Sequence, residues 1–184
     1  KMRLLLVNGY PTSNITLLCE GSGDNIEDNT APYTDGSRYN LSAYDRMDDE
    51  IFAWEDVKSG SDTDSPSNVW EGCYHSIACA NAVLDKIPEL EAKGMKEQVQ
   101  AVKGEALLIR AFNHFVLANM FCPAYRGAEL SKADQGIPYM TKSETEVSVD
   151  YQRIDLAQVY ELIEKDIERL EPWGEFDRKV ITEL

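Results

Sequence analysis

Three long stretches of the chain place apolar residues at every third or fourth position, and this spacing predicts amphipathic α-helices. The first helix is expected over residues 65–87, because Ser65 can cap its start and Pro66 suits the first helical position. Pro88 is expected to end it, since the proline ring removes a backbone donor. Its apolar face comprises Trp70, Cys73, Ile77, Ala80, Leu84 and Ile87.

The second helix is expected over about residues 95–121, with Pro123 ending it. Its apolar positions form two adjoining edges, and a stripe this wide predicts burial on two sides, as in a stack of helices. The short connection, residues 88–94, predicts that the first two helices form an antiparallel hairpin. The first edge comprises Met95, Val99, Val102, Ala106, Ile109, Phe112, Val116 and Met120, and the second comprises Leu108, Phe115 and Leu117.

A third helix is expected over residues 155–170. Asp155 and Gln158 have the spacing of a capping box, and Glu161 lies one turn before Lys165, where an acid–base pair stabilises a helix. Little of the chain remains after this helix, so we expect it to have no partner helix. Its apolar face would then be exposed, and the isolated chain would be marginally stable or would self-associate.

The remaining segments are predicted to be irregular. Residues 1–66 are rich in Asp, Asn, Ser, Gly and Tyr, and the first four of these favour turns. Residues 51–57 are expected to form a short ordered segment. Residues 122–153 form a second loop region, in which residues 136–139 are extended because Pro138 disfavours a helical residue before it. The predicted fold class is therefore mainly α, with long irregular loops on the N-terminal side.

The charge of the chain limits its partners. The 184 residues include 18 Lys and Arg against 33 Asp and Glu, which gives a formal net charge of −15. This excess of negative charge argues against nucleic acids as partners and against a polybasic attraction to membranes. A hydrophobic share of 43% is typical of globular proteins and argues against a fully disordered or fibrous chain.

No segment predicts membrane insertion or targeting. A spanning helix needs about 20 apolar residues. The apolar run near the N-terminus covers only residues 4–7, and a signal peptide needs about 7–15 apolar residues in its core. We therefore expect no targeting segment, which suits either a cytoplasmic protein or a mature or trimmed secreted one.

The reactive residue types form no recognisable catalytic or metal-binding motif. The four cysteines contain no C-x-x-C pair, which favours buried free thiols and leaves disulfides as the alternative. His75 and His114 lie inside predicted helices, as structural or surface histidines. We predict no catalytic residue, no metal and no cofactor, with a glycosidase that uses loop carboxylates as the enzymatic alternative. The cysteines are Cys19, Cys73, Cys79 and Cys122.

Aromatic residues in the N-terminal loops indicate a candidate ligand site. They stand among Asp, Asn and Arg residues, and sugars are bound by flat aromatic faces together with such hydrogen-bonding side chains. The alternative is that these aromatic residues anchor the loops to the helical core. The candidate ligand-binding residues are Tyr33, Arg38, Tyr39, Tyr44 and Trp54.

Several blocks of the sequence, in order and with suitable spacing, resemble the N-terminal portion of SusD/RagB-family proteins. The similarity extends over about residues 4–171. The blocks are the acidic segment from Glu20 to Asp24-Asn25, Trp70 to Ile77 with Asn81, Gly104-Glu105-Ala106 with Arg110-Ala111, Gly136-Ile137-Pro138, and Arg153 with Val159-Tyr160 and Asp166.

This resemblance implies a function and a location. Members of the family are surface lipoproteins of Bacteroidetes that bind nutrients, typically glycans, and form the lid of a TonB-dependent transporter. A non-catalytic protein at the extracellular face of the outer membrane is therefore expected, with an oligosaccharide ligand and a SusC-like transporter as partners. The lipid anchor implied by the family has no matching cysteine in this chain. A tetratricopeptide-like adaptor that binds other proteins is the alternative.

The resemblance also implies how the chain is organised. The helices of the family form tetratricopeptide-like hairpins, in which the matching Trp70, Asn81, Glu105 and Arg110 serve packing. Because family members are much longer, we expect residues 1–184 to be a single N-terminal domain from a longer chain. Its expected parts are a loop-rich segment (1–66), a helical hairpin (67–121), and a loop with the start of the next repeat (122–184).

Overall fold

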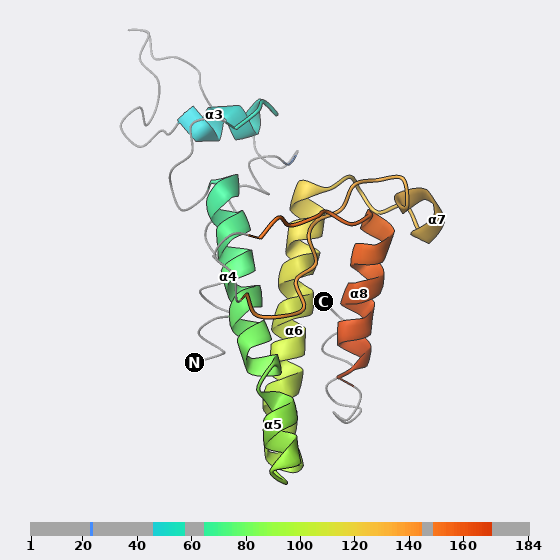
Figure 1. Cartoon of the computed structure of the whole chain (residues 1–184). Helices are drawn as coiled ribbons and strands as arrows, with labels where there is room; N and C mark the ends of the chain where they lie inside the picture. The colour runs from blue at the N-terminus through green and yellow to red at the C-terminus, as the bar shows by residue number, and fades with distance from the viewer. Residues whose placement is uncertain (1–22, 24–45, 58–64, 145–148, 171–184) are drawn as a thin grey trace, which may run out of the picture. The chain divides into compact units, whose positions relative to one another are not determined.

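The computed structural model describes Gly23 and residues 46–57, 65–144 and 149–170 (Figure 1). These residues belong to two compact units that divide between Gly72 and Cys73, here called the N-terminal unit and the C-terminal unit. The regular structure of the described residues is helical, with one isolated β-bridge. The mainly α, tetratricopeptide-like fold class is thus confirmed, whereas most of the predicted N-terminal loops lie outside the described residues.

The N-terminal unit contains helix α3 (Arg46–Phe52) and the start of α4 (Pro66–Leu84). Met47 and Ile51 lie one helical turn apart and are both buried, which explains why α3 forms. From the sequence, the ordered segment was expected to begin at residue 51. This prediction was wrong, because it missed the apolar pair that Ile51 forms with the preceding turn. The start of α4 is as predicted, since the backbone N–H of Asn68 donates to Ser65 Oγ at 3.3 Å.

The C-terminal unit is built around α6 (Lys96–Phe121), which lies between the second half of α4 and α8 (Leu156–Glu168) (Figure 1). On the α4 side, Ala80 packs against Ala106 and Ile109, and the partly buried Val83 and Leu84 complete this cluster. Both neighbours run antiparallel to α6 (Figure 1). The predicted hairpin and the predicted two-sided burial of the second helix are confirmed.

Helix α8 packs along α6, so the expectation of an unpartnered third helix was wrong. Its apolar residues Leu156, Val159 and Ile163 are all buried. From the second apolar edge of α6, Phe115 contacts Tyr160 of α8 edge-on. The predicted Glu161–Lys165 pair is present, with 2.6 Å between Oε1 and Nζ.

The connection between α4 and α6 contains a helix of its own, α5 (Ile87–Ala92). The prediction that the first helix runs to residue 87 and that Pro88 simply ends it was therefore wrong. Pro88 lacks the N–H that would bond to the carbonyl of Leu84, four residues earlier, and α4 ends at Leu84. Pro88 instead occupies the first turn of α5, where a missing N–H costs nothing.

The chain after α6 passes through the short helix α7 (Ala128–Ser131) and then runs extended, as predicted for residues 136–139. The N–H of Gly136 donates to the carbonyl of Ile154 at 2.8 Å. A Cβ at Gly136 would lie 2.8 Å from that same oxygen, so the approach of the two segments requires glycine. Asp155 then caps α8, because its Oδ1 accepts the N–H of Gln158 at 2.9 Å.

Candidate functional site

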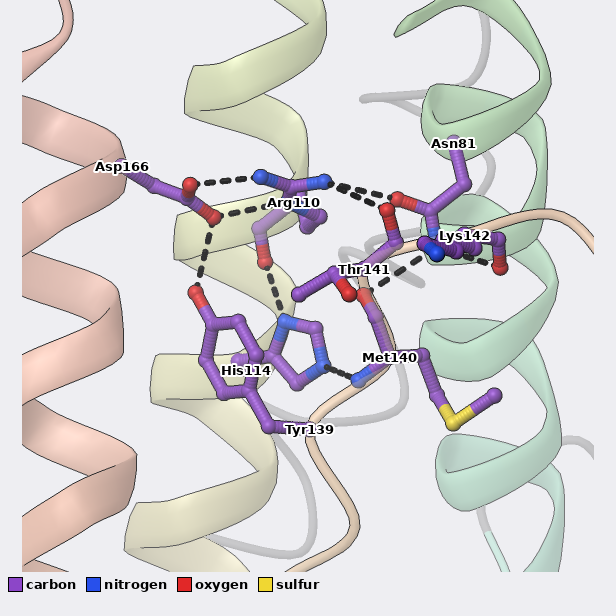
Figure 2. A network of polar contacts seen from close by, with 8 residues as sticks. All are labelled: Asn81, Arg110, His114, Tyr139, Met140, Thr141, Lys142 and Asp166. Atoms are coloured by element: carbon purple, nitrogen blue, oxygen red, sulfur yellow. Dashed lines mark hydrogen bonds and ion pairs between the residues drawn. The ribbon is translucent and has the colours of Figure 1, made fainter. Parts of the chain in front are cut away.

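A buried polar network crosses the C-terminal unit, and its centre is Arg110 in the middle of α6 (Figure 2). Arg110 is 4% exposed, and its partner Asp166 on α8 is 3% exposed. Nε and Nη2 of Arg110 donate to Oδ2 and Oδ1 of Asp166 at 2.7 and 2.6 Å. This two-pronged arrangement is the geometry that matches a guanidinium to a carboxylate, and it ties α6 to α8.

The same guanidinium reaches the opposite side of α6. Nη1 of Arg110 donates to Oδ1 of Asn81 on α4 at 3.0 Å and to the carbonyl of Thr141 at 3.2 Å. The amide nitrogen of Asn81 donates in turn to the carbonyls of Met140 and Lys142, at 3.1 and 3.2 Å. Arg110 and Asn81 therefore join three helices to the extended segment (Figure 2).

His114 lies one turn after Arg110 on α6 and is fully buried. The N–H of Met140 donates to its Nε2 at 3.1 Å, so Nε2 carries no hydrogen. Nδ1 must then carry the hydrogen, and it donates to the carbonyl of Arg110 at 2.8 Å. The imidazole is neutral in this arrangement, and burial lowers the pKa of His114 to about 4.

Two tyrosines complete the network. The ring of Tyr139 stacks on His114 with 3.8 Å between the centroids, and its hydroxyl donates to Oδ2 of Asp166 at 2.8 Å. Burial, and then the negative charge of Asp166, raise the pKa of Tyr139. Tyr74 on α4 donates its hydroxyl to the carbonyl of Pro138 at 2.8 Å. Burial likewise raises the pKa of Tyr74.

This network holds the fold together and offers little to a substrate. Its charged pair is enclosed, and the carboxylate of Asp166 already accepts three hydrogen bonds. Side chains of α4 and α6 form hydrogen bonds with backbone groups of residues 138 and 140–142 and so hold this extended segment against the two helices. The packing roles expected for Asn81 and Arg110 agree with this geometry, while Glu105 is half-buried on α6.

The described residues provide no evident metal centre. Within residues 46–57, 65–144 and 149–170, no group of three or more His, Cys, Asp or Glu side chains could hold an ion. Cys73, Cys79 and Cys122 are free thiols, as favoured from the sequence, but only Cys73 is buried as expected, and Cys19 lies outside the described residues. Burial raises the pKa of the Cys73 thiol to about 11, which keeps it protonated and unreactive.

Trp54 is the one predicted ligand-binding residue that the structure describes. It follows α3 and is 78% exposed, so its ring is not buried as a core anchor. Its backbone has φ = +57°, a left-handed conformation that is unusual for a bulky side chain. Its N–H donates to the carbonyl of Ile51 at 3.2 Å. The other four predicted residues, Tyr33, Arg38, Tyr39 and Tyr44, lie outside the described residues.

The sequence prediction missed a second group of aromatic residues, on the C-terminal unit. Tyr125 and Tyr160 stack with 4.2 Å between their ring centroids, and Phe115 meets Tyr160 edge-on at 6.2 Å. Asn119 joins them, since its Oδ1 lies 3.5 Å from the Tyr160 hydroxyl. Phe115 and Asn119 are one turn apart in the sequence, but only the packing of α8 on α6 brings Tyr160 beside them.

Comparison with known proteins gives a family match over most of the chain. Residues 13–170 match the SusD-like family, which is described as starch-binding and associating with the outer membrane. This match includes all the described helices and the network around Arg110. No curated protein matches the chain. Among the described residues, none of the helices is both long and apolar enough to cross a membrane.

Proposed function

The chain belongs to the SusD-like family, and we propose that it captures neutral glycans, starch among them, at the outer membrane without altering them chemically. The observation that carries this proposal is the family match over residues 13–170. The net charge of −15 supports an uncharged ligand, because a polyanionic one would be repelled. The closed network around Arg110 serves as scaffold in this proposal.

Delivery of the captured glycan completes the proposed function. The family resemblance supports a SusC-like, TonB-dependent transporter as the partner that receives it. It also supports a position at the extracellular face, held by a lipid anchor. Helical hairpins suit this role, because they form a rigid scaffold whose surfaces can bind one partner while loops bind another.

We place the glycan at the N-terminal loops, on Trp54 together with Tyr33, Arg38, Tyr39 and Tyr44. Two properties of Trp54 support this placement. An indole that is 78% exposed is unfavourable to the chain alone, and its face is available to stack on a sugar ring. Its left-handed backbone is a strained conformation of the kind that concentrates at ligand-binding sites.

Replacing Trp54 by asparagine is expected to separate binding from stability. Loss of the indole should raise the Kd for maltoheptaose about tenfold, since stacking and burial of one aromatic ring contribute of the order of 1.4 kcal/mol. The melting temperature should stay unchanged or rise, because asparagine tolerates a left-handed backbone better than tryptophan. Isothermal titration calorimetry and thermal unfolding measure the two effects.

Trp54→Phe is the matched control, because it keeps an aromatic face at the same position. It should retain most of the affinity. Equal affinity of Trp54→Asn and the wild type would remove Trp54 from the site. Maltoheptaose recovered after the titration should be intact, and shorter products would overturn the non-catalytic part of the proposal.

A further inference from the structure

Three rings and one amide gather on the surface of the C-terminal unit, and we call Phe115, Asn119, Tyr125 and Tyr160 the tyrosine cluster. The cluster lies where α6 ends and α8 begins (Figure 1). Tyr125 and Tyr160 stack at an interplanar angle of 26°, and Phe115 stands nearly perpendicular to Tyr160 at 83°. The amide of Asn119 donates to the carbonyl of Phe115 at 2.8 Å and thereby fixes its own orientation.

The segment that carries Tyr125 is held in place by its neighbours. The N–H of Arg126 donates to Oγ of the buried Ser131 at 3.0 Å. Nη2 of Arg126 contacts both carboxylate oxygens of Asp134, at 3.0 and 2.9 Å. The carbonyl of Asp134 accepts the N–H of Leu156 at the start of α8, at 3.0 Å. The surface around Tyr125 is therefore preformed, so a ligand that binds there does not incur the entropic cost of ordering it.

The cluster remains exposed although its rings contact one another. Phe115 is 44% exposed and Tyr125 is 41% exposed, even with Tyr125 stacked on Tyr160. An amide has two N–H donors and an oxygen with two lone pairs, so Asn119 keeps capacity for a ligand beyond its bonds within the cluster. Arg126 pairs with Asp134 through one nitrogen, and its side chain is 55% exposed.

Aromatic faces with an amide at their edge are groups that recognise a sugar ring and its hydroxyls. We infer that the tyrosine cluster is a second binding site for a neutral glucan chain, separate from Trp54 and located on the C-terminal unit. This inference rests on the proposed function. Starch repeats one sugar unit many times, so two sites on one protein can hold the same polymer and raise its apparent affinity.

Tyr125→Ala in the whole 184-residue chain tests the inference, with maltoheptaose as the probe. Calorimetry should give two binding sites per wild-type chain and one per Tyr125→Ala chain. Retention of the variant in native gels that contain soluble starch should fall by about fivefold to tenfold, as expected for a lost stacking contact. Tyr125→Phe should bind as the wild type does, because it preserves the ring.

Tyr151→Ala is the matched control, since Tyr151 is 39% exposed and lies outside the cluster. It should keep both sites. The ring NMR signals of Tyr125 and Tyr160 should also shift when maltoheptaose is added to the wild type, which tests the site even if a variant fails to fold. Shifts confined to other aromatic residues would overturn the inference.

The remaining outcomes separate this inference from the proposed function. Wild-type binding that Tyr125→Ala leaves unchanged in both stoichiometry and affinity would overturn the second site and leave the proposed function intact. No binding of any neutral glycan by the wild type would overturn both. If Tyr125→Ala abolished self-association without affecting glucan binding, the cluster would be an interface between copies, and the inference would again be overturned.

Discussion

Replacing Asp166 by alanine should lower the free energy of unfolding by about 3–5 kcal/mol, because it leaves the guanidinium of Arg110 buried without its counter-charge. The variant also removes the acceptor for the hydroxyl of Tyr139. The first loss separates α8 from α6, and the second separates α8 from the extended segment that carries Tyr139. Denaturant unfolding followed by circular dichroism measures the change, with the midpoint and the slope both recorded.

The double variant Arg110→Met, Asp166→Leu provides the control. With both charges removed, the buried cation disappears together with its partner, and the double variant should be clearly more stable than the sum of the single variants predicts. A loss of less than about 1 kcal/mol for Asp166→Ala would contradict the buried pair, because that is the range of exposed ion pairs.

Acidification should destabilise the fold through His114. The ordinary pKa of histidine is 6.5 and the folded protein holds His114 at about 4, so between these values the unfolded chain binds more protons. Stability therefore falls as the pH falls through this window, by about 3 kcal/mol in all. The main physical reason is burial, which disfavours the charged imidazolium, and a proton on Nε2 would also face the N–H of Met140 that now donates to it.

His114→Gln isolates this contribution. Glutamine can still accept a hydrogen bond but does not titrate, and the many carboxylates that also titrate in acid are common to both proteins. The variant should have a lower free energy of unfolding than the wild type at about pH 7.5. This difference in the free energy of unfolding should be smaller by about 2–3 kcal/mol at about pH 4.5. Parallel pH profiles of the two proteins would contradict a neutral, buried His114.

Periodicity in the sequence was sufficient to predict the three long helices. Helix α6 lies within one residue of its predicted bounds, because Pro123 marks its end and its apolar residues repeat over seven turns. Helix α5 was missed, since Pro88 was interpreted as a stop alone and not as the first turn of a new helix. Helix α3 was missed because one pair of apolar residues is too weak a pattern.

The partners of polar residues could not be predicted from the same patterns. The sequence indicated that Arg110 anchors the packing and that Asp166 belongs to a family-like block, but the two lie 56 positions apart and no spacing pairs them. Such a pairing depends on how two helices pack. Tyr125 and Tyr160 were missed for the same reason. Trp54 could be proposed as a ligand residue because a large aromatic side chain among loop residues is itself an informative signal.

Migration of the whole 184-residue chain in native gels with and without soluble starch tests the proposed glycan capture most directly. We expect the chain to be slowed as the starch concentration rises, while a non-binding reference protein migrates unchanged. Unchanged migration of the chain in starch, and in gels containing other neutral glycans, would contradict glycan capture as its function.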